Sequence, residues 1–413
     1  MLLQNAGLTD GRRVDVRVAG TDVGEVAPAG KLEISDGEER LDLSGYLLLP
    51  ALAEPHTHLD KALTADRFGQ QFTSLPAAIS AWHAYRETLG VSDMVERARR
   101  AALLALAHGA TSIRTHTDVG RGIGLRAVEA LLRVRDELHA LVDIQVVALV
   151  YPLTGEEGGE NRSLLRAAMR LGADVVGGAP HVDPDPAGQV ERCLETATEF
   201  GRPVDLHADE NLRRTSVDLT ELLRQVGTGF PHRVTASHCV SLGIQPAEVQ
   251  AEIAAAASVC GVSVVTLPIA NLYLQGRDAP TATPRGLTAI HALLAAGVAV
   301  AGGGDNIQDP FIPVGRADPL LTAQYLVVAG QLSPATAHEL VGSKAREVMG
   351  LPPLTIAPGS QADLVAVAGS SLREAIAHAS EDRLVFRKGR LVSRTRILED
   401  EQLDSARAKV EHE

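Results

Sequence analysis

Cysteine, basic residues and long apolar runs are all scarce in this chain. Only three of its 413 residues are cysteine, and Cys193, Cys239 and Cys260 are an odd, widely spaced set. Such a set fits reduced thiols better than a disulfide framework. No stretch is apolar for long enough to span a membrane, and residues 1–5 lack the basic segment of a signal peptide. The sequence therefore predicts a cytoplasmic protein without a membrane partner.

Positive charge is outweighed by negative charge. The chain has 39 Lys and Arg residues against 52 Asp and Glu residues, for a formal net charge of −13. Such a balance argues against nucleic acid or an anionic membrane surface as the main partner. The composition is otherwise that of an ordinary globular protein, and the length suits one large domain with a small one.

Both ends of the chain have short segments in which apolar and polar residues alternate. These segments are 14–18 and 41–43 near the N-terminus, and 362–367, 383–387 and 391–393 near the C-terminus. Strands of this kind need a common sheet. We predict that residues 1–49 and 354–413 form one composite β-sandwich, and that residues 50–353 form the main domain.

Apolar runs alternate with helical patterns in the middle of the chain. After a strand that ends at His56, the runs are 112–115, 144–151, 174–177, 203–207, 234–238, 262–267 and 298–301. The helical patterns are 125–139, 163–171, 188–200, 217–226, 247–259 and 285–296. This alternation predicts a parallel sheet, and eight strands favour a closed TIM-like (β/α)₈ barrel. No glycine-rich dinucleotide fingerprint follows the first strand, which weighs against a Rossmann fold.

A long excursion separates the first two barrel strands. Residues 68–75 read as a loop, whereas 77–89 and 94–108 have helical patterns. The excursion could cover the mouth of the barrel. Trp82 would then belong to a lid, although a plain packing role under a loop is the more economical interpretation.

His56 and His58 form a His-x-His pair at the end of the first barrel strand. Alternate residues of a strand share one face, and at about 3.3 Å per residue the two lie about 6.6 Å apart. Their rings can therefore converge on one metal ion.

Other polar side chains follow the strands at the end where barrel active sites lie. They are Arg114, His116 and Asp118 on the second strand, Tyr151, His181, His207 with Glu210, His238, and Asp305 with Asn306. Three imidazoles and a carboxylate suit one catalytic divalent ion with a position left for water. Residues 173–180 contain no lysine that could bridge a second ion. Glu210, three residues past His207, is well placed as a proton shuttle.

Seven motifs make the chain resemble the amidohydrolase superfamily, and within it the cytosine deaminase branch, over nearly its entire length. They are EPHTHLD (54–60), RTHTDV (114–119), GADVVGG (172–178), HADE (207–210), VTASH (234–238), NLYLQGR (271–277) and DNIQDP (305–310).

The resemblance implies a role for each of six residues. The metal ligands would be His56, His58, His207 and Asp305, which hold one divalent ion per chain, zinc or iron. Glu210 would shuttle the proton, and His238 would polarise or orient the attacking water. His238 and Asp305 would also stabilise the tetrahedral intermediate and accept protons. Members of this branch form homo-oligomers, so we expect a homo-oligomer here.

The chain departs from the cytosine deaminase pattern around the substrate. The glutamine that reads the pyrimidine amide is missing from 148–153, where Tyr151 or Val150 takes its place. Asn306 stands for the second aspartate and Phe311 for a tryptophan. The Asp-Asn pair is similar to that of relatives that hydrolyse N-alkylated triazines. We expect Tyr151, Asn306 and Phe311 to contact the substrate.

We therefore predict a metal-dependent hydrolase of a non-peptide C–N bond that deaminates an amino-substituted nitrogen heterocycle and is not specific for cytosine. The alternative is hydrolysis of a cyclic amide or an N-substituted amine such as an N-alkylated triazine. A non-catalytic scaffold protein is the remote alternative, because every ligand that the resemblance implies is present.

Overall fold

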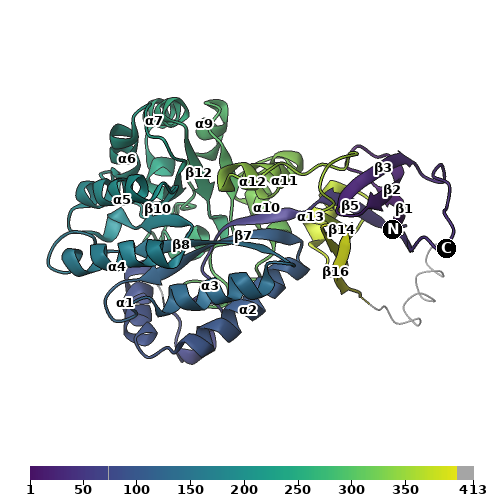
Figure 1. The fold of residues 1–413 in the computed structure, drawn as a ribbon. Helices are drawn as coiled ribbons and strands as arrows, with labels where there is room; N and C mark the ends of the chain where they lie inside the picture. The colour runs from purple at the N-terminus through teal and green to yellow at the C-terminus, as the bar shows by residue number, and fades with distance from the viewer. Residues whose placement is uncertain (73, 398–413) are drawn as a thin grey trace. The chain divides into compact units, whose positions relative to one another are not determined.

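The structure is a computed structural model that describes residues 1–72 and 74–397 (Figure 1). One unit is Pro50–Thr355, and the other combines Met1–Leu49 with the described residues from Ile356 onward. Among the described residues, no helix has both the length and the apolar character needed to cross a bilayer.

The larger unit is built on an eight-stranded sheet in the order β13-β12-β11-β10-β9-β8-β7-β6. Its strands are β6 (Leu52–Thr57), β7 (Ala110–Val119), β8 (Asp143–Val150), β9 (Val175–Gly178), β10 (Val204–Ala208), β11 (Val234–His238), β12 (Val262–Thr266) and β13 (Val300–Gly302). Helices surround the sheet (Figure 1), which buries the strands on both faces and explains their nearly continuous apolar runs. The predicted (β/α)₈ barrel is confirmed.

The helices of this unit follow the predicted alternation. They are η1 (Ala65–Arg67), α1 (Leu75–Arg86), α2 (Val91–Ala107), α3 (Arg126–Leu138), α4 (Gly158–Leu171), η2 (Pro180–Val182), α5 (Pro186–Phe200), α6 (Asp218–Val226), η3 (Val240–Ile244), α7 (Ala247–Cys260), α8 (Pro268–Leu274), α9 (Ile290–Ala295), α10 (Pro319–Val328), α11 (Pro334–Val341) and α12 (Ser343–Met349). Gly201 and Gly261 end α5 and α7 with φ of 63° and 67°, the left-handed conformation that glycine adopts most readily.

The helix predicted over 285–296 is much shorter in the structure. Gly286 has φ of +68°, outside the helical region, and a Cβ at this position would lie 2.9 Å from the carbonyl oxygen of Asn271. The chain therefore turns here, and α9 begins only at Ile290. The prediction was wrong because the helical pattern was extended across a glycine that serves as a turn.

The first and last strands of the barrel meet through Asp305. Its backbone N–H donates to the carbonyl of His56 at 2.9 Å, and its carbonyl accepts from the N–H of His58 at 3.1 Å. The same carbonyl accepts from the Thr57 hydroxyl at 2.6 Å. Glu54 braces this closure seam, because its carboxylate accepts from the N–H groups of His56 and Gly304 at 3.1 and 3.0 Å. Burial raises the pKa of Glu54 to about 8.

The smaller unit is also built on one sheet, in the order β16-β15-β14-β5-β1-β2-β3, with β4 paired to β1. Its strands are β1 (Leu2–Gly7), β2 (Arg13–Ala19), β3 (Asp22–Pro28), β4 (Arg40–Asp42), β5 (Tyr46–Pro50), β14 (Leu364–Ala368), β15 (Arg383–Arg387) and β16 (Arg390–Thr395). Helix α13 (Leu372–His378) connects β14 to β15. The two chain ends thus share one sheet through the β5–β14 neighbours.

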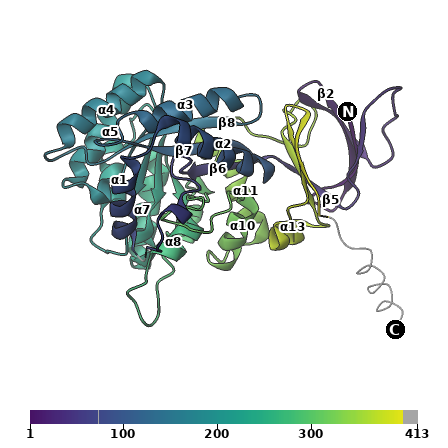
Figure 2. The same cartoon turned by 90° about the horizontal axis from the view of Figure 1, so that it is seen from below.

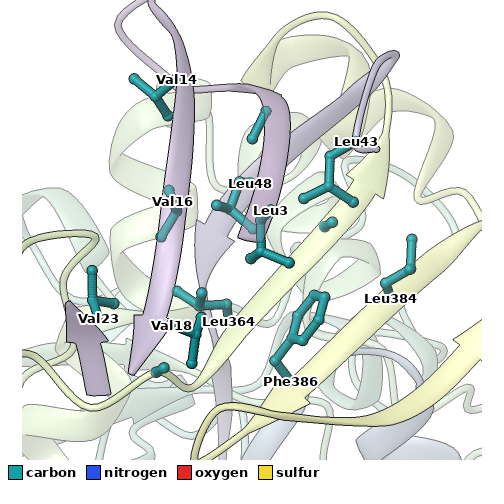
Figure 3. Packing of buried hydrophobic residues seen from close by; sticks show 13 residues of the cluster. Leu3, Val14, Val16, Val18, Val23, Leu43, Leu48, Leu364, Leu384 and Phe386 are labelled. Atoms are coloured by element: carbon teal, nitrogen blue, oxygen red, sulfur yellow. The ribbon is translucent and has the colours of Figure 1, made fainter. Parts of the chain in front are cut away.

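This sheet folds over a single apolar cluster. Figure 2 shows the purple N-terminal strands facing the yellow C-terminal strands, and Figure 3 shows the side chains between them. Val16 and Leu3 from the first segment and Leu384 and Phe386 from the second are all buried in this cluster. The fold is sandwich-like, as predicted, although one continuous sheet provides both layers.

Phe386 allows a direct test of this packing. Its ring is fully buried, whereas Leu391, its partner on β16, is 39% exposed. Phe386→Ala should lower the free energy of unfolding by about 3–5 kcal/mol, as measured by urea denaturation. Leu391→Ala is the matched control and should change it by less than about 1 kcal/mol. Equal effects of the two substitutions would contradict this account of the core.

Candidate metal and catalytic site

The carboxyl ends of the barrel strands bring the four predicted ligands together. His56 and His58 come from the end of β6, His207 from β10, and Asp305 from the loop after β13. The Nε2 atom of His58 lies 3.3 Å from Nε2 of His207 and 3.3 Å from Oδ1 of Asp305. The Nε2 atom of His56 lies 3.7 Å from the same Oδ1. All four side chains are buried.

Hydrogen bonds on the far side of each ring orient the two imidazoles from β6. The Nδ1 atom of His56 lies 2.9 Å from the Ser237 hydroxyl, which donates to Asp205 at 2.8 Å. The Nδ1 atom of His58 lies 2.9 Å from the carbonyl oxygen of His116. Partners of this kind fix the tautomer and leave Nε2 for coordination. Both Nε2 atoms therefore point toward Asp305.

The donor set fits a divalent metal ion. Six buried histidine ring nitrogens have no hydrogen-bond partner among the described residues, and they include Nε2 of His56, Nδ1 of His207 and Nε2 of His238. Buried polar atoms are rarely left unpaired. Burial lowers the pKa of His56 and His207 well below the usual histidine value, so both rings are neutral, as coordination requires. Imidazole nitrogen and carboxylate oxygen suit zinc or iron.

Three groups of ligand-type side chains lie close enough together in the described part of the chain to hold an ion. They are His56, His58 and Asp305; His56, His207 and His238; and His56, His116 and Asp205. The last group is a poor cation site, because the guanidinium of Arg114 lies 2.9 Å from the carboxylate of Asp205. The other two groups overlap at His56, and together they contain all four predicted ligands and His238.

Glu210 and His238 are adjacent beside this cluster. The Oε1 atom of Glu210 lies 3.5 Å from Nδ1 of His238. Burial, reinforced by the charge of Asp305, raises the pKa of Glu210 well above its ordinary value. Burial lowers the pKa of His238 to about 3. Burial therefore favours the uncharged form of both side chains.

Backbone strain concentrates at this site. Asp209, His238 and Asp305 have φ values of 51°, 70° and 65°, in the left-handed region that residues other than glycine rarely adopt. Such residues persist only where the surrounding structure holds them, and they cluster at functional sites. All three follow the carboxyl end of a barrel strand or terminate it.

A cavity opens in front of the cluster. Tyr151, Asn306 and Phe311, the predicted substrate contacts, all line it. Val150, the other candidate after the third strand, is fully buried in β8 and does not line it. The alternative that the sequence left open is thereby reduced to Tyr151.

Lys61 lines the same cavity, although the sequence interpretation gave it no role. Its ammonium group is buried, donates to Asp118 at 2.7 Å and lies 3.1 Å from Nδ1 of His58. Asp118 also accepts from Trp82 Nε1 and from Arg86, each at 2.7 Å. A lysine three residues after the His-x-His motif was the signal that could have identified Lys61.

Asp118 of β7 connects the segment between the first two barrel strands to the barrel, because Trp82 and Arg86 of α1 both donate to its carboxylate. Trp82 lies on α1, and Leu75 and Ile79 of the same helix line the cavity. Trp82 is therefore a packing residue and also holds a cavity wall in place. Although burial of Asp118 opposes its ionisation, the charges of Lys61 and Arg86 hold its pKa below the usual value.

His181 was selected by the strand-end rule, but the sequence interpretation gave it no role. It lies in η2, after β9, and its Nδ1 atom lies 3.1 Å from the carbonyl oxygen of His207. Its Nε2 atom faces the cavity, 3.9 Å from Oε2 of Glu210. By contrast, Arg114 and His116 were selected by the same strand-end rule, but neither lines the cavity.

Comparison with known proteins identifies the class. A model of the amidohydrolase family matches residues 72–393. The chain is 32% identical over 395 residues to pterin deaminase of Rhizobium rhizogenes, covering 94% of this chain and 87% of that protein. The chain therefore belongs to the amidohydrolase family. It is a hydrolase that acts on carbon–nitrogen bonds other than peptide bonds.

Two crystal structures share the whole architecture. One is 5-methylcytosine deaminase from Klebsiella pneumoniae with 5-fluorocytosine, with a TM-score of 0.87 and 26% identity, covering 97% of this chain and 99% of that one. The other is N-isopropylammelide isopropylaminohydrolase from Burkholderia multivorans, with a TM-score of 0.82 and 30% identity, covering 95% and 98%.

The metal content of the purified protein tests the ligand set. We expect about one divalent ion per chain, and His207→Ala should lose the ion because a missing ligand opens the site. His139→Ala removes an exposed histidine outside the site and should keep the ion. Elemental analysis of the three proteins is the measurement. Two ions per chain, or full activity after the ion is removed, would contradict the assignment.

Proposed function

We propose that this protein is a metal-dependent deaminase of an amino-substituted nitrogen heterocycle, with a bicyclic pterin-type ring as the preferred substrate. The observation that carries the proposal is Glu210, a buried carboxyl group next to His238 at the edge of the ligand cluster. The relative named pterin deaminase, at 32% identity over nearly the whole chain, supports the substrate class.

His56, His58, His207 and Asp305 would hold the metal ion. A divalent ion in such a site supplies the Lewis acidity that makes water a nucleophile near neutral pH. Zinc and iron both match this donor set. The family resemblance further supports a homo-oligomer, and the unpaired cysteines support a reducing compartment such as the cytoplasm.

Glu210 carries the proton in the proposed reaction. It takes a proton from the attacking water and gives it to the ring nitrogen next to the reacting carbon. As the carbonyl forms, the hydroxyl group of the tetrahedral intermediate loses its proton, and Glu210 delivers that proton to the leaving amine. Water and an amino-substituted ring carbon thus become a ring carbonyl and ammonia. The raised pKa of Glu210 matches this alternation between base and acid.

His238 and Asp305 would stabilise the intermediate. The Nδ2 atom of Asn271 lies 3.1 Å from Nδ1 of His238 and donates to it. The neutral ring then has its hydrogen on Nε2, which lies 4.0 Å from Asp305 Oδ2 and faces the reacting centre. This arrangement lets His238 orient the water and stabilise the developing oxyanion, while Asp305 accepts a proton.

Tyr151 argues against cytosine as the natural substrate. Its hydroxyl lies 3.2 Å from Nε2 of His83, and a phenol thus stands where the cytosine deaminase pattern has the glutamine that pairs with the pyrimidine edge. Each buried ligand group left unpaired costs about 1–3 kcal/mol, or roughly 5- to 150-fold in affinity. Phe311 replaces a larger tryptophan and leaves room for a wider ring.

Hydrolysis of an N-alkylated triazine is the second candidate. Asn306 directly follows Asp305, lines the cavity and donates to Asp309 at 2.8 Å. The Burkholderia isopropylaminohydrolase structure, at 30% identity, supports this candidate. The two reactions differ in their product, since one releases ammonia and the other an alkylamine.

Glu210→Gln keeps the shape of the side chain and removes the base. Turnover should fall by about 100-fold or more, with the metal content unchanged. His238→Asn should also impair turnover and leave the ion bound, and loss of the ion would instead make His238 a ligand. Steady-state kinetics and elemental analysis on the same preparations check both variants. If the Glu210→Gln variant keeps activity within a few-fold of the native enzyme, Glu210 is not the proton shuttle.

A three-substrate comparison tests the substrate class. We expect ammonia from pterin with a kcat/KM above about 10⁴ M⁻¹s⁻¹, the range of natural substrates, and values at least about 10-fold lower on cytosine, because its edge groups stay unpaired. N-isopropylammelide should release little isopropylamine. Efficient cytosine deamination would contradict the inference that Tyr151 disfavours cytosine. Efficient isopropylamine release would favour the second candidate.

A further inference from the structure

A second, larger cleft opens directly from the catalytic cavity. The two share Leu75, Ile79, His181, Val182 and Glu210 as lining residues. A ring that reacts beside Glu210 therefore faces the cleft with one of its edges. The deamination itself requires only the inner cavity, so the chemistry proposed above leaves the outer cleft without a role.

The walls of the outer cleft are mostly apolar. Besides the shared leucine, isoleucine and valine, the cleft is lined by Pro76, Leu212, Leu274, Ala279 and Pro284. Apolar walls with a few placed polar groups are typical of sites that bind small molecules. Such walls favour an aryl or alkyl group over a hydrated, polar chain.

Two arginines provide the positive charge of this cleft. The Nε atom of Arg213 donates to Asn211 Oδ1 at 3.2 Å. The Nε atom of Arg277 donates to the carbonyl oxygen of Tyr273 at 2.7 Å, and its guanidinium lies 4.3 Å from the centroid of that ring. In the part of the chain that the structure describes, no carboxylate forms an ion pair with either arginine. Both are held through Nε, which leaves the terminal nitrogens for a ligand.

The charge balance favours an anion with a single charge. Asp278 is the exposed acidic residue of the lining, whereas Glu210 is buried and belongs to the inner catalytic cavity. Two arginines and one aspartate leave one net positive charge at the mouth of a protein whose formal net charge is −13. A guanidinium group binds a carboxylate through two parallel hydrogen bonds.

We propose that the outer cleft is a substrate subsite for a substituent with an apolar body and a terminal carboxylate. The apolar walls hold the aryl or alkyl body, and Arg213 and Arg277 bind the carboxylate. The inference rests on the proposed function, because the amino-heterocycle must occupy the inner cavity for its substituent to enter the cleft. The substrate class is then an amino-heterocycle with an arylcarboxylate or alkylcarboxylate arm.

Pteroate and its neutral primary amide form a matched pair of probes. They share the pterin ring and the aryl arm and differ only in the terminal charge. The native holoenzyme should deaminate pteroate with a kcat/KM roughly 3- to 30-fold higher than the amide, the range that two partly exposed ion pairs supply. The difference should appear in KM, since the arm binds far from the reacting carbon.

Substitution of the arginines isolates their contribution. The double variant Arg213→Gln, Arg277→Gln should lower the kcat/KM for pteroate to that for the amide. The kcat/KM for the amide should stay within about 2-fold of the native value. Arg214→Gln is the matched control, because this neighbouring arginine is also exposed but does not line the cleft. Raising the salt from 0.1 to 1 M shortens the Debye length from about 10 to 3 Å, so the native preference for pteroate should shrink.

Each remaining outcome overturns a specific claim. Equal kcat/KM for pteroate and its amide in the native enzyme would overturn the subsite, as would an equal loss on both probes in the double variant. Turnover of pterin without turnover of pteroate would overturn the subsite but leave the proposed function intact. Absence of ammonia from all three compounds would overturn the proposed function, and the subsite with it.

Discussion

The backbone hydrogen bonds between Asp305 and the His56–His58 segment are the constraint on which the rest of the structure depends. They join the first and last strands of the barrel across a separation of 248 residues. Three of the four candidate ligands lie in this seam, so closure of the barrel and assembly of the candidate metal site are one event. Glu54 reinforces the seam from inside, where a side chain at Gly304 would put a Cβ 2.9 Å from its carboxylate.

The packing around the hydrogen bonds between Asp305 and His56–His58 also explains why energetically unfavourable features are retained there. Buried imidazoles with unpaired nitrogens and non-glycine residues with positive φ each cost folding free energy. A protein retains such features where the surrounding packing holds them and where a ligand compensates for them. The Asp118 bridge extends the same principle outward, because one buried carboxylate holds Lys61 beside His58 and also anchors α1 through Trp82 and Arg86.

Periodicity and strand-end residues predicted the barrel and the convergence of its histidines, because both are local consequences of strand–helix alternation. The same rule could not distinguish His116, which stacks on His56 beneath the site, from His181, which faces the cavity. Which end of a ring meets the cavity depends on partners distant in sequence, such as Ser237 for His56. Lys61 was missed for the same reason. The prediction of a helix over 285–296 was wrong at Gly286, whose backbone lies close to the carbonyl oxygen of Asn271.

The composite sheet makes the folding of this chain depend on the order of its synthesis. Strands β1 to β5 are made first, but β14, the neighbour of β5, appears only after the whole of Pro50–Thr355. At about 5–20 residues per second, the early strands wait on the order of 15–60 s for that partner. During this interval an unpaired edge of β5 is open to pairing with another chain. A ribosome-bound chaperone that covers β1 to β5 would therefore be expected to raise the yield of folded protein.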